Sequence, residues 1–206
     1  GIPRQAVHKN TPIKGTTATA REVAHPNSIC LWNTDMYGVN ASKTGAQSYY
    51  DSILELYAEW GVDFLKEDDI AKPNTNEEIE LIQNAKKKKK REIVLSLSPG
   101  PAPVEEAEHL KKYANMWRMT DDFWDTWGHL YPMFDKCKEW SDHVEEGHWP
   151  DADMLPLGHI GIKSVEHGVS DRWTRFSKDE QILMMTLWAI FRSPLMMGGH
   201  LPDNDK

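Results

Sequence analysis

The sequence has few cysteines, no long apolar run and no excess of positive charge. Its only cysteines are Cys30 and Cys137, which excludes a fold held by a disulfide framework and makes two free thiols the default expectation. The longest apolar run, Ile182–Phe191, has about half of the roughly 20 residues that a membrane-spanning helix needs. We therefore expect neither a disulfide-rich scaffold nor a membrane protein.

The charge balance is acidic. The formal net charge is −8, because 32 Asp and Glu residues outnumber 24 Lys and Arg residues. Such a chain repels nucleic acids and anionic membranes, so neither is the expected partner. A small neutral or cationic substrate is compatible with this charge, as it is with most soluble enzymes. The charge therefore argues against two classes of partner, nucleic acids and anionic membranes, but it does not identify the function.

The chain alternates short apolar runs with amphipathic helical stretches. Six runs are predicted as strands: Pro12–Thr17, Val62–Asp68, Ile93–Ser98, Met116–Asp122, a short piece near His148–Met154, and Pro194–Gly198. Five stretches are predicted as helices: Gly45–Trp60, Asn76–Lys89, Val104–Tyr113, Thr126–Trp140 and Lys178–Phe191. Near-continuous apolar strands suit a parallel sheet that is buried on both faces, and strand–helix alternation indicates βα units.

Polar side chains end several of the predicted strands. They are Lys66, Asp68 and Asp69 on one strand, Ser98 on the next, Arg118, Asp121 and Asp122 on another, and Asp151 and Asp153 on the one after it. Charged groups that recur at the C-terminal ends of parallel strands mark the active-site face of a (β/α)8 barrel. A doubly wound sheet would instead gather them at one switch point. The predicted fold is therefore an α/β TIM barrel.

The predicted barrel is incomplete. About six βα units are found, corresponding to strands 3 to 8, whereas a complete barrel takes about 250 residues. We expect residues 1–206 to form a single partial catalytic domain without two N-terminal strands and a closing helix, and we expect the chain to be processed or truncated because it begins at Gly1. Open parallel edges are an aggregation hazard, so self-association or a complementing chain is also expected.

Four segments resemble one enzyme family. They are YYDSILELYAEWGVDFLKEDD at Tyr49–Asp69, WRMTDDFWDTW at Trp117–Trp127, GHWPDADMLPLG at Gly147–Gly158 and LWAIFRSPLMMGGHL at Leu187–Leu201. In this order and spacing the set resembles glycoside hydrolase family 27, the α-galactosidase and α-N-acetylgalactosaminidase family. The resemblance implies a TIM-barrel exo-glycosidase that retains configuration, acts on a galactoside-type carbohydrate without cofactor or metal, and is secreted or periplasmic.

The resemblance also implies roles for individual residues. Asp68, at the end of a Lys–x–Asp motif, is the implied nucleophile, and Asp122, at the end of an Arg–x–x–x–Asp motif, is the implied acid/base. We expect six further residues to bind substrate or support the site: Lys66, Ser98, Arg118, Trp149, Asp151 and Asp153. Among these, the tryptophan is the candidate stacking platform, the last aspartate is implied to bind sugar hydroxyls, and Asp151 is implied to support the loop.

The chemistry of retention sets opposite demands on the two carboxyl groups, because one must be ionised and the other protonated. Lys66 lies two residues before Asp68, so both side chains point to one face of a strand, and the cation favours the ionised nucleophile. Burial of Asp122 against the aromatic residues that follow it, or the acid that precedes it, would raise its pKa. Arg118 either moderates that shift or binds a sugar hydroxyl.

Two departures from the family pattern leave the sugar open. Ser98 and Pro99 stand where family α-galactosidases tend to have Glu–Trp, and a serine there resembles the α-N-acetylgalactosaminidase branch, in which a shorter side chain makes room for a 2-acetamido group. The family's second-strand motif, Trp–x–Asp–Asp, is absent. Galactose, N-acetylgalactosamine and β-L-arabinopyranose all remain candidate sugars.

Two alternative functions also remain. The absent second strand favours a non-catalytic barrel fragment that has both carboxylates but cannot hold substrate. A metal-dependent hydrolase would require His143 or His148 to converge with Asp151 or Asp153, since imidazole and carboxylate are common metal ligands.

Overall fold

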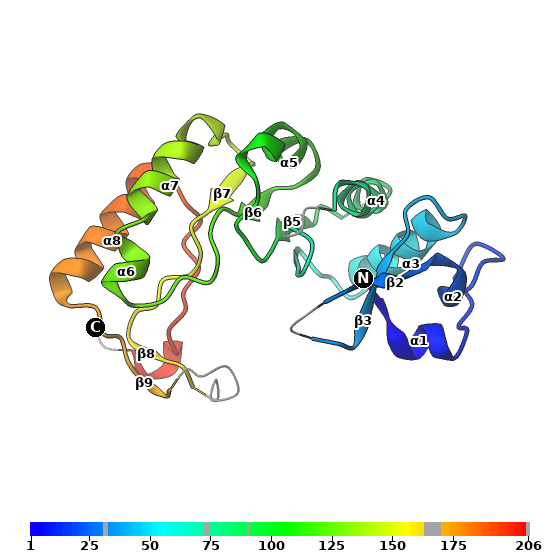
Figure 1. The fold of residues 1–206 in the computed structure, drawn as a ribbon, viewed down its shortest axis with the longest axis horizontal. Helices are drawn as coiled ribbons and strands as arrows, with labels where there is room; N and C mark the ends of the chain where they lie inside the picture. The colour runs from blue at the N-terminus through cyan, green and yellow to red at the C-terminus, as the bar shows by residue number, and fades with distance from the viewer. Residues whose placement is uncertain (31–32, 72–74, 90, 163–169, 205–206) are drawn as a thin grey trace. The chain divides into compact units, whose positions relative to one another are not determined.

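The computed structural model describes residues 1–30, 33–71, 75–89, 91–162 and 170–204 (Figure 1). The chain divides into two compact units: unit 1 is Gly1–Ser98 with Lys111–Ala114, and unit 2 is Pro99–Leu110 with Asn115–Lys206. No helix within the described ranges is long and apolar enough to cross a membrane.

Unit 1 combines an antiparallel sheet with a βαβ element. Its elements are β1 (Ile2–Pro3), α1 (Arg4–His8), α2 (Ala20–Val23), β2 (Ala24–Ile29), β3 (Met36–Val39), α3 (Ala46–Glu59), β4 (Phe64–Glu67), α4 (Asn76–Lys87) and β5 (Val94–Leu97). Strands β1, β3 and β2 form the antiparallel sheet in that order. Strands β4 and β5 pair in parallel, and α4 connects them.

Helix α3 shows how the sequence builds this unit. It begins after Gly45, whose φ of 100° is a left-handed conformation that glycine adopts without strain. Ala46, Tyr50 and Leu54 are buried at intervals of four residues, so one stripe of the helix faces the interior. Helices α3 and α4 pack against each other, which places the buried stripe of α3 in the core of unit 1.

Unit 2 continues the βα alternation and adds a short hairpin. Its elements are η1 (Val104–Glu106), α5 (Ala107–Tyr113, whose last turn is assigned to unit 1), β6 (Met116–Arg118), α6 (Trp127–Leu130), α7 (Met133–Trp140), η2 (Ser141–His143), β7 (Trp149–Asp151), β8 (His159–Ile160), β9 (Arg172–Trp173), α8 (Lys178–Phe191) and η4 (Leu201–Asp203). Strands β6 and β7 are parallel, whereas β8 and β9 are antiparallel.

Helix α8 carries its own start signal. Ser177 and Glu180 form a capping box, in which each side chain satisfies a backbone N–H group of the first turn. Met184, Trp188 and Phe191 are the buried residues of this helix. Its bounds agree with the predicted ones, because the sequence shows both the capping residues and the apolar stripe.

Two predicted strands are wrong. Pro12–Thr17 is a turn through Gly15, whose φ is 80°, and only an isolated bridge joins Pro12 to Thr19. Pro194–Gly198 makes only an isolated bridge between Met197 and Leu155. In the first run Pro12 lacks an N–H donor and Gly15 permits a turn, whereas the second run bonds to Leu155 only through the Met196 carbonyl and the Gly198 N–H.

The predicted helix Thr126–Trp140 is two helices, α6 and α7. Pro132 occupies the N-cap position of α7 and has no N–H to continue a helical hydrogen-bond ladder. Strands β2 and β3 were not predicted. The polar sequence AHPNSI of β2 is mostly exposed, so it lacks the apolar alternation that indicates a strand.

Candidate active site

The predicted nucleophile lies at the end of β4. The parallel register pairs Lys66 with Ser96 and Glu67 with Leu97, so the next residues of the two strands, Asp68 and Ser98, are neighbours. The Ser98 hydroxyl donates a hydrogen bond to Oδ1 of Asp68. The structure therefore brings together two of the residues that the sequence predicts, with Ser98 buried and Asp68 exposed.

Lys66 lies on the same face of β4 as Asp68. The side chains of Lys66 and Asp68 are both exposed, whereas those of Leu65 and Glu67 are partly buried, in the alternation of a strand. This placement agrees with the prediction that the lysine and the nucleophile share one face.

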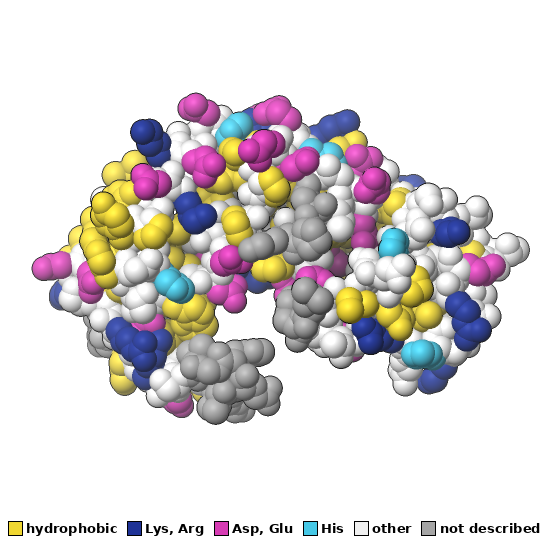
Figure 2. Space-filling view, in the orientation of Figure 1, with side chains coloured by type: hydrophobic (Ala, Val, Ile, Leu, Met, Phe, Trp, Pro, Cys, Tyr) yellow, Lys and Arg dark blue, Asp and Glu magenta, His cyan; other side chains and the backbone are white. Residues whose placement is uncertain are grey.

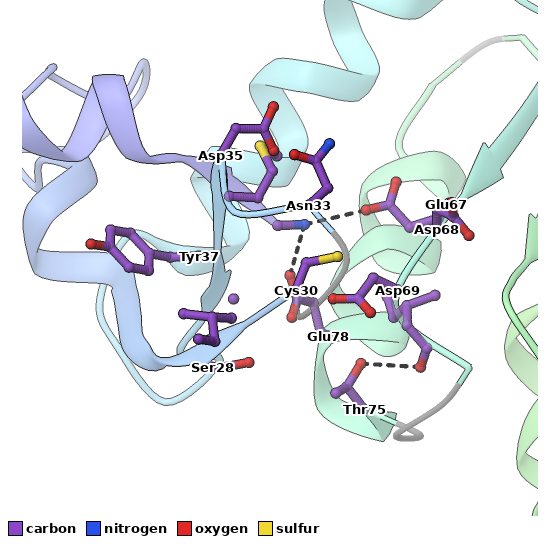
Figure 3. Close-up of a pocket in the computed structure, with 15 residues that line it drawn as sticks. Ser28, Cys30, Asn33, Asp35, Tyr37, Glu67, Asp68, Asp69, Thr75 and Glu78 are labelled. Atoms are coloured by element: carbon purple, nitrogen blue, oxygen red, sulfur yellow. Dashed lines mark hydrogen bonds and ion pairs between the residues drawn. The ribbon is translucent and has the colours of Figure 1, made fainter. Parts of the chain in front are cut away.

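A cavity of about 240 Å³ opens beside the end of β4 within unit 1 (Figure 3). Asp68 and Asp69 line it, together with Cys30, Asn33 and Tyr37 from the segment around β2 and β3. Its wall mixes carboxylates, an amide and a phenol with apolar groups, which is the composition of a small polar-ligand pocket. The described part of unit 1 thus places the predicted nucleophile on the wall of a cavity.

Two further acids that line this cavity, the partly buried Glu67 and the buried Glu78, were missed by the sequence reasoning. Glu78 accepts hydrogen bonds from the Tyr50 hydroxyl and from the Val39 backbone N–H. The Gly1 nitrogen lies 3.2 Å from Glu78 and 3.3 Å from Glu67. Burial raises the pKa of Glu67, and burial together with the charge of Glu78 raises the pKa of Tyr50 well above its usual range.

The sequence signal for these acids was present but ambiguous. Glu78 lies in the first turn of α4, where an acid complements the helix dipole without any further role. Only the tertiary structure shows that its side chain turns inward.

In unit 2, Arg118 joins two carboxylates. Its side chain at the end of β6 is only 3% exposed, and its guanidinium lies 3.2 Å from Asp122 and 2.9 Å from Asp153. Asp122 is 74% exposed, so the expected burial of this carboxyl group against aromatic neighbours is not found in this chain. Two predicted site residues, Asp122 and Asp153, nevertheless meet the guanidinium of a third.

The loop after β7 holds Asp153 in a defined position. The φ of Asp153 is 77°, a left-handed conformation that costs energy outside glycine. Its carboxylate accepts a hydrogen bond from the Phe123 backbone N–H at 2.7 Å, and its own N–H donates to Asp151 at 2.9 Å. Burial raises the pKa of Asp153, and the charge of Arg118 opposes that shift. Asp151, which accepts the hydrogen bond from the Asp153 N–H, is itself buried.

Trp149, the predicted stacking platform, is partly buried in β7. The guanidinium of Arg192 lies 5.3 Å from the centroid of its ring, within the range of a cation–π contact. One cation therefore already contacts this indole.

A buried ion pair in unit 2 was also missed. Asp125 is fully buried, and both of its oxygens accept hydrogen bonds from Arg172. The Arg175 backbone N–H donates to the same carboxylate at 2.6 Å. Asp125 follows Asp122 by three residues, so this pair anchors the loop that carries the predicted acid/base.

The convergence that a metal-dependent hydrolase would need is not seen among the described residues. His143 packs edge-on against Trp140, with ring centroids 5.6 Å apart. Within the described ranges, the one group of three possible metal ligands is His159, His200 and Asp203, which does not include the predicted histidines.

Comparison with known proteins identifies the family. The family model described as α-galactosidase A matches residues 15–205. This chain belongs to glycoside hydrolase family 27. Among solved structures, it is similar to a family 27 β-L-arabinopyranosidase from Geobacillus stearothermophilus, with 64% sequence identity and a TM-score of 0.96 over the whole chain and 48% of that enzyme.

Curated relatives are more distant. Human α-galactosidase A is 28% identical over 172 residues, and α-N-acetylgalactosaminidase from Gallus gallus is 29% identical over 158 residues. The matches cover 76% and 71% of this family 27 chain, and 36% of each relative. The fold is part of a TIM barrel, and the chain spans about half or less of the proteins that it resembles.

Proposed function

We propose that this chain carries both catalytic carboxylates of a retaining exo-glycosidase, with Asp68 as nucleophile and Asp122 as acid/base. The observation that carries the proposal is the end of β4, where Asp68 lines a cavity and accepts a hydrogen bond from Ser98. Membership of a glycoside hydrolase family supports the reaction class.

The proposed reaction has two displacements. In the first, an oxygen of Asp68 bonds to the anomeric carbon while the bond to the leaving oxygen breaks and Asp122 gives that oxygen its proton. In the second, water attacks the same carbon, Asp122 accepts a proton from the water, and the bond to Asp68 breaks. The proposal requires the two carboxyl groups to stand about 5 Å apart in the working enzyme.

The neighbouring residues take supporting roles in this proposal. Ser98 orients Asp68 through its hydrogen bond, and Arg118 orients Asp122 from its buried position. Lys66 is proposed to contact the substrate from the face of β4 that it shares with Asp68. Asp153 and Trp149 are proposed to contact sugar hydroxyls and an apolar face of the sugar ring, respectively.

A galactose-configured pyranose is the proposed sugar, with β-L-arabinopyranoside as the preferred substrate. The relative that is 64% identical is a β-L-arabinopyranosidase, and a variant of that enzyme was solved with arabinose. β-L-arabinopyranose has the ring configuration of α-D-galactopyranose without the hydroxymethyl group. Ser98 argues against an N-acetylgalactosaminide, because its buried hydroxyl is engaged by Asp68 and does not face open space.

Rates on matched substrates test the sugar. Nitrophenyl β-L-arabinopyranoside, α-D-galactopyranoside and N-acetyl-α-D-galactosaminide share one leaving group, so kcat/KM values compare sugar recognition directly. The proposal expects kcat/KM to be highest for the arabinopyranoside, lower for the galactoside and lowest for the N-acetylgalactosaminide. A preference for the acetamido sugar would contradict it.

Variants test the two roles. Asp68→Asn is expected to reduce turnover to background, whereas Asp63→Asn, at an exposed residue just before β4, retains activity. Asp122→Asn is expected to lose about 10²- to 10⁴-fold on substrates with poor leaving groups, since these need a general acid. The loss should shrink with a dinitrophenyl leaving group, and Asp121→Asn serves as the control. Absence of turnover in the unmodified chain would favour the non-catalytic fragment instead.

We also propose that the exposed apolar faces of unit 2 pack against the rest of a family 27 barrel, supplied by the same polypeptide or another chain. Figure 2 shows hydrophobic side chains gathered over α7 and α8, where Phe134, Ile182 and Ile190 are exposed, the last by 77%. Light scattering of the isolated chain is expected to report self-association. A monodisperse monomer would contradict this part of the proposal.

A further inference from the structure

Two histidines and an aspartate converge at the end of unit 2. His159 in β8 directs Nδ1 to Asp203 at 2.6 Å, and His200 directs its own Nδ1 to the other oxygen of Asp203 at 2.5 Å. The candidate ligand atoms of these three residues all lie within 4.8 Å of one another. The sequence reasoning passed over this group, because 40 residues separate its two histidines and only the fold joins them.

The second nitrogen of His159 has a carboxylate of its own. Nε2 of His159 shares a hydrogen bond with the carboxylate of Asp171, the residue before β9. Metal-binding histidines commonly donate their outer N–H to a carboxylate, which fixes the tautomer and makes the inner nitrogen a stronger ligand. Trp173 stacks on the same imidazole at 5.5 Å with an interplanar angle of 18°, so the ring plane is held as well.

The backbone segments that carry His159 and His200 lie in close contact. The His200 backbone N–H donates to the His159 carbonyl at 2.8 Å. A Cβ at Gly199 would lie 2.0 Å from the Leu157 carbonyl oxygen, and one at Gly158 would lie 1.8 Å from Asn204. The backbone contact at Gly199 therefore requires a glycine, and the φ of 66° at Gly158 favours one before His159 as well.

We propose that His159, His200 and Asp203 bind one divalent transition-metal ion, with zinc as the ion that the ligand set fits best. Two imidazole nitrogens and one carboxylate suit zinc, whereas all-oxygen sites suit magnesium and calcium. Water completes the coordination. The ion ties η4 to the β8–β9 hairpin, a structural role that does not depend on the proposed glycosidase activity.

Coordination requires only a small local adjustment. Zinc ligands lie at about 2.0 to 2.2 Å from the ion, so the nitrogen and oxygen atoms that now share protons must separate by roughly 0.5 to 1 Å. His200 and Asp203 are exposed and can make that movement, while the stacked and partly buried His159 provides the fixed ligand. In the absence of zinc, the same atoms form a hydrogen-bonded His–Asp–His network.

Zinc binding by the whole chain tests the proposal. After treatment with EDTA and dialysis, the chain is equilibrated with zinc chloride, and bound zinc is measured by atomic emission. One zinc per chain is expected, with loss of this stoichiometric binding in His200→Ala and in Asp203→Asn. His8→Ala, which removes an exposed histidine from α1, should bind as the unmodified chain does.

Further measurements keep the test independent of folding. Asp171→Asn is expected to weaken zinc binding about 10- to 100-fold without abolishing it, as for other carboxylates that orient a metal ligand. Zinc should raise the Tm of the unmodified chain and leave that of His200→Ala unchanged, whereas magnesium should shift neither. Zinc retained by both His200→Ala and Asp203→Asn, or no zinc bound by the unmodified chain beyond the His200→Ala level, would overturn the proposal.

Discussion

The two carboxylates proposed for catalysis are held in different ways. Asp68 follows β4 and accepts a hydrogen bond from Ser98, at the end of the adjacent parallel strand. Asp122 stands on a loop and depends on the buried Arg118, which also binds Asp153. Strand register therefore positions the proposed nucleophile, whereas an ion-pair network positions the proposed acid/base. Substitutions near Asp122 should consequently cost more than substitutions near Asp68.

The largest expected effect is on the stability of the Asp122 loop. Asp125→Ala removes the partner of Arg172, which is only 17% exposed, and breaking a buried ion pair from one side costs about 3 to 5 kcal/mol. Urea denaturation measures the free energy of unfolding. Arg175→Ala is the control, because Arg175 is exposed and contributes its backbone N–H to Asp125, and a change within about 0.5 kcal/mol is expected. Equal losses in the two variants would contradict an anchoring role for the ion pair.

Arg118→Lys should separate charge from geometry. Lysine keeps the positive charge, but it cannot reproduce the planar fork that contacts Asp122 and Asp153 from separate nitrogens. We expect kcat/KM to fall about 10- to 100-fold, which is about 1.4 to 2.7 kcal/mol, with most of the loss in kcat. Steady-state kinetics on a nitrophenyl glycoside gives both parameters. Unchanged kcat would mean that the network does not position the acid/base.

Ser98→Ala tests how the hydrogen bond from Ser98 contributes to positioning Asp68. The hydroxyl donates to Asp68, and its loss is expected to lower kcat/KM about 10-fold, the equivalent of one hydrogen bond of about 1.4 kcal/mol. Ser96→Ala removes another buried serine from the same strand and should leave kcat/KM unchanged. A loss of kcat/KM larger than that of Arg118→Lys would contradict the expectation that substitutions near Asp122 cost more than those near Asp68.

The smallest effect is a pH dependence that comes from Asp153. Because its folded pKa is raised, the folded chain binds more protons than the unfolded chain between the ordinary Asp pKa and the raised one. Stability from this group is thus present at low pH and is lost as pH rises through that window. Asp153→Asn should remove this slope in urea denaturation measured across the acid range. A slope of the opposite sign would mean that Arg118 outweighs burial.

The local features of the fold could be predicted from the sequence. Strands β4, β5, β6 and β7 lie inside four of the predicted strand ranges, and α8 has both a capping box and an apolar stripe. The polar residues at the ends of those strands were therefore placed correctly, and Asp68 meets Ser98 as strand pairing requires. The exposed strand β2, with its proline, has no such signal.

Contacts between distant residues could not be predicted. Arg172 lies 47 positions from Asp125, and Tyr50 lies 28 positions from Glu78. In each case an ordinary acid in a loop or a first helical turn is buried by a partner that no spacing rule connects to it. The contact between Arg118 and Asp153, which are 35 positions apart, is of the same kind.

Trapping the glycosyl-enzyme is the measurement that tests the central claim most directly. An activated fluorosugar of the preferred configuration forms the covalent intermediate faster than water releases it, and peptide mass spectrometry then locates the sugar. The account predicts one added glycosyl unit on the peptide that contains Asp68, and none in Asp68→Asn. A label on another carboxylate, or turnover with inverted configuration and no label, would contradict it.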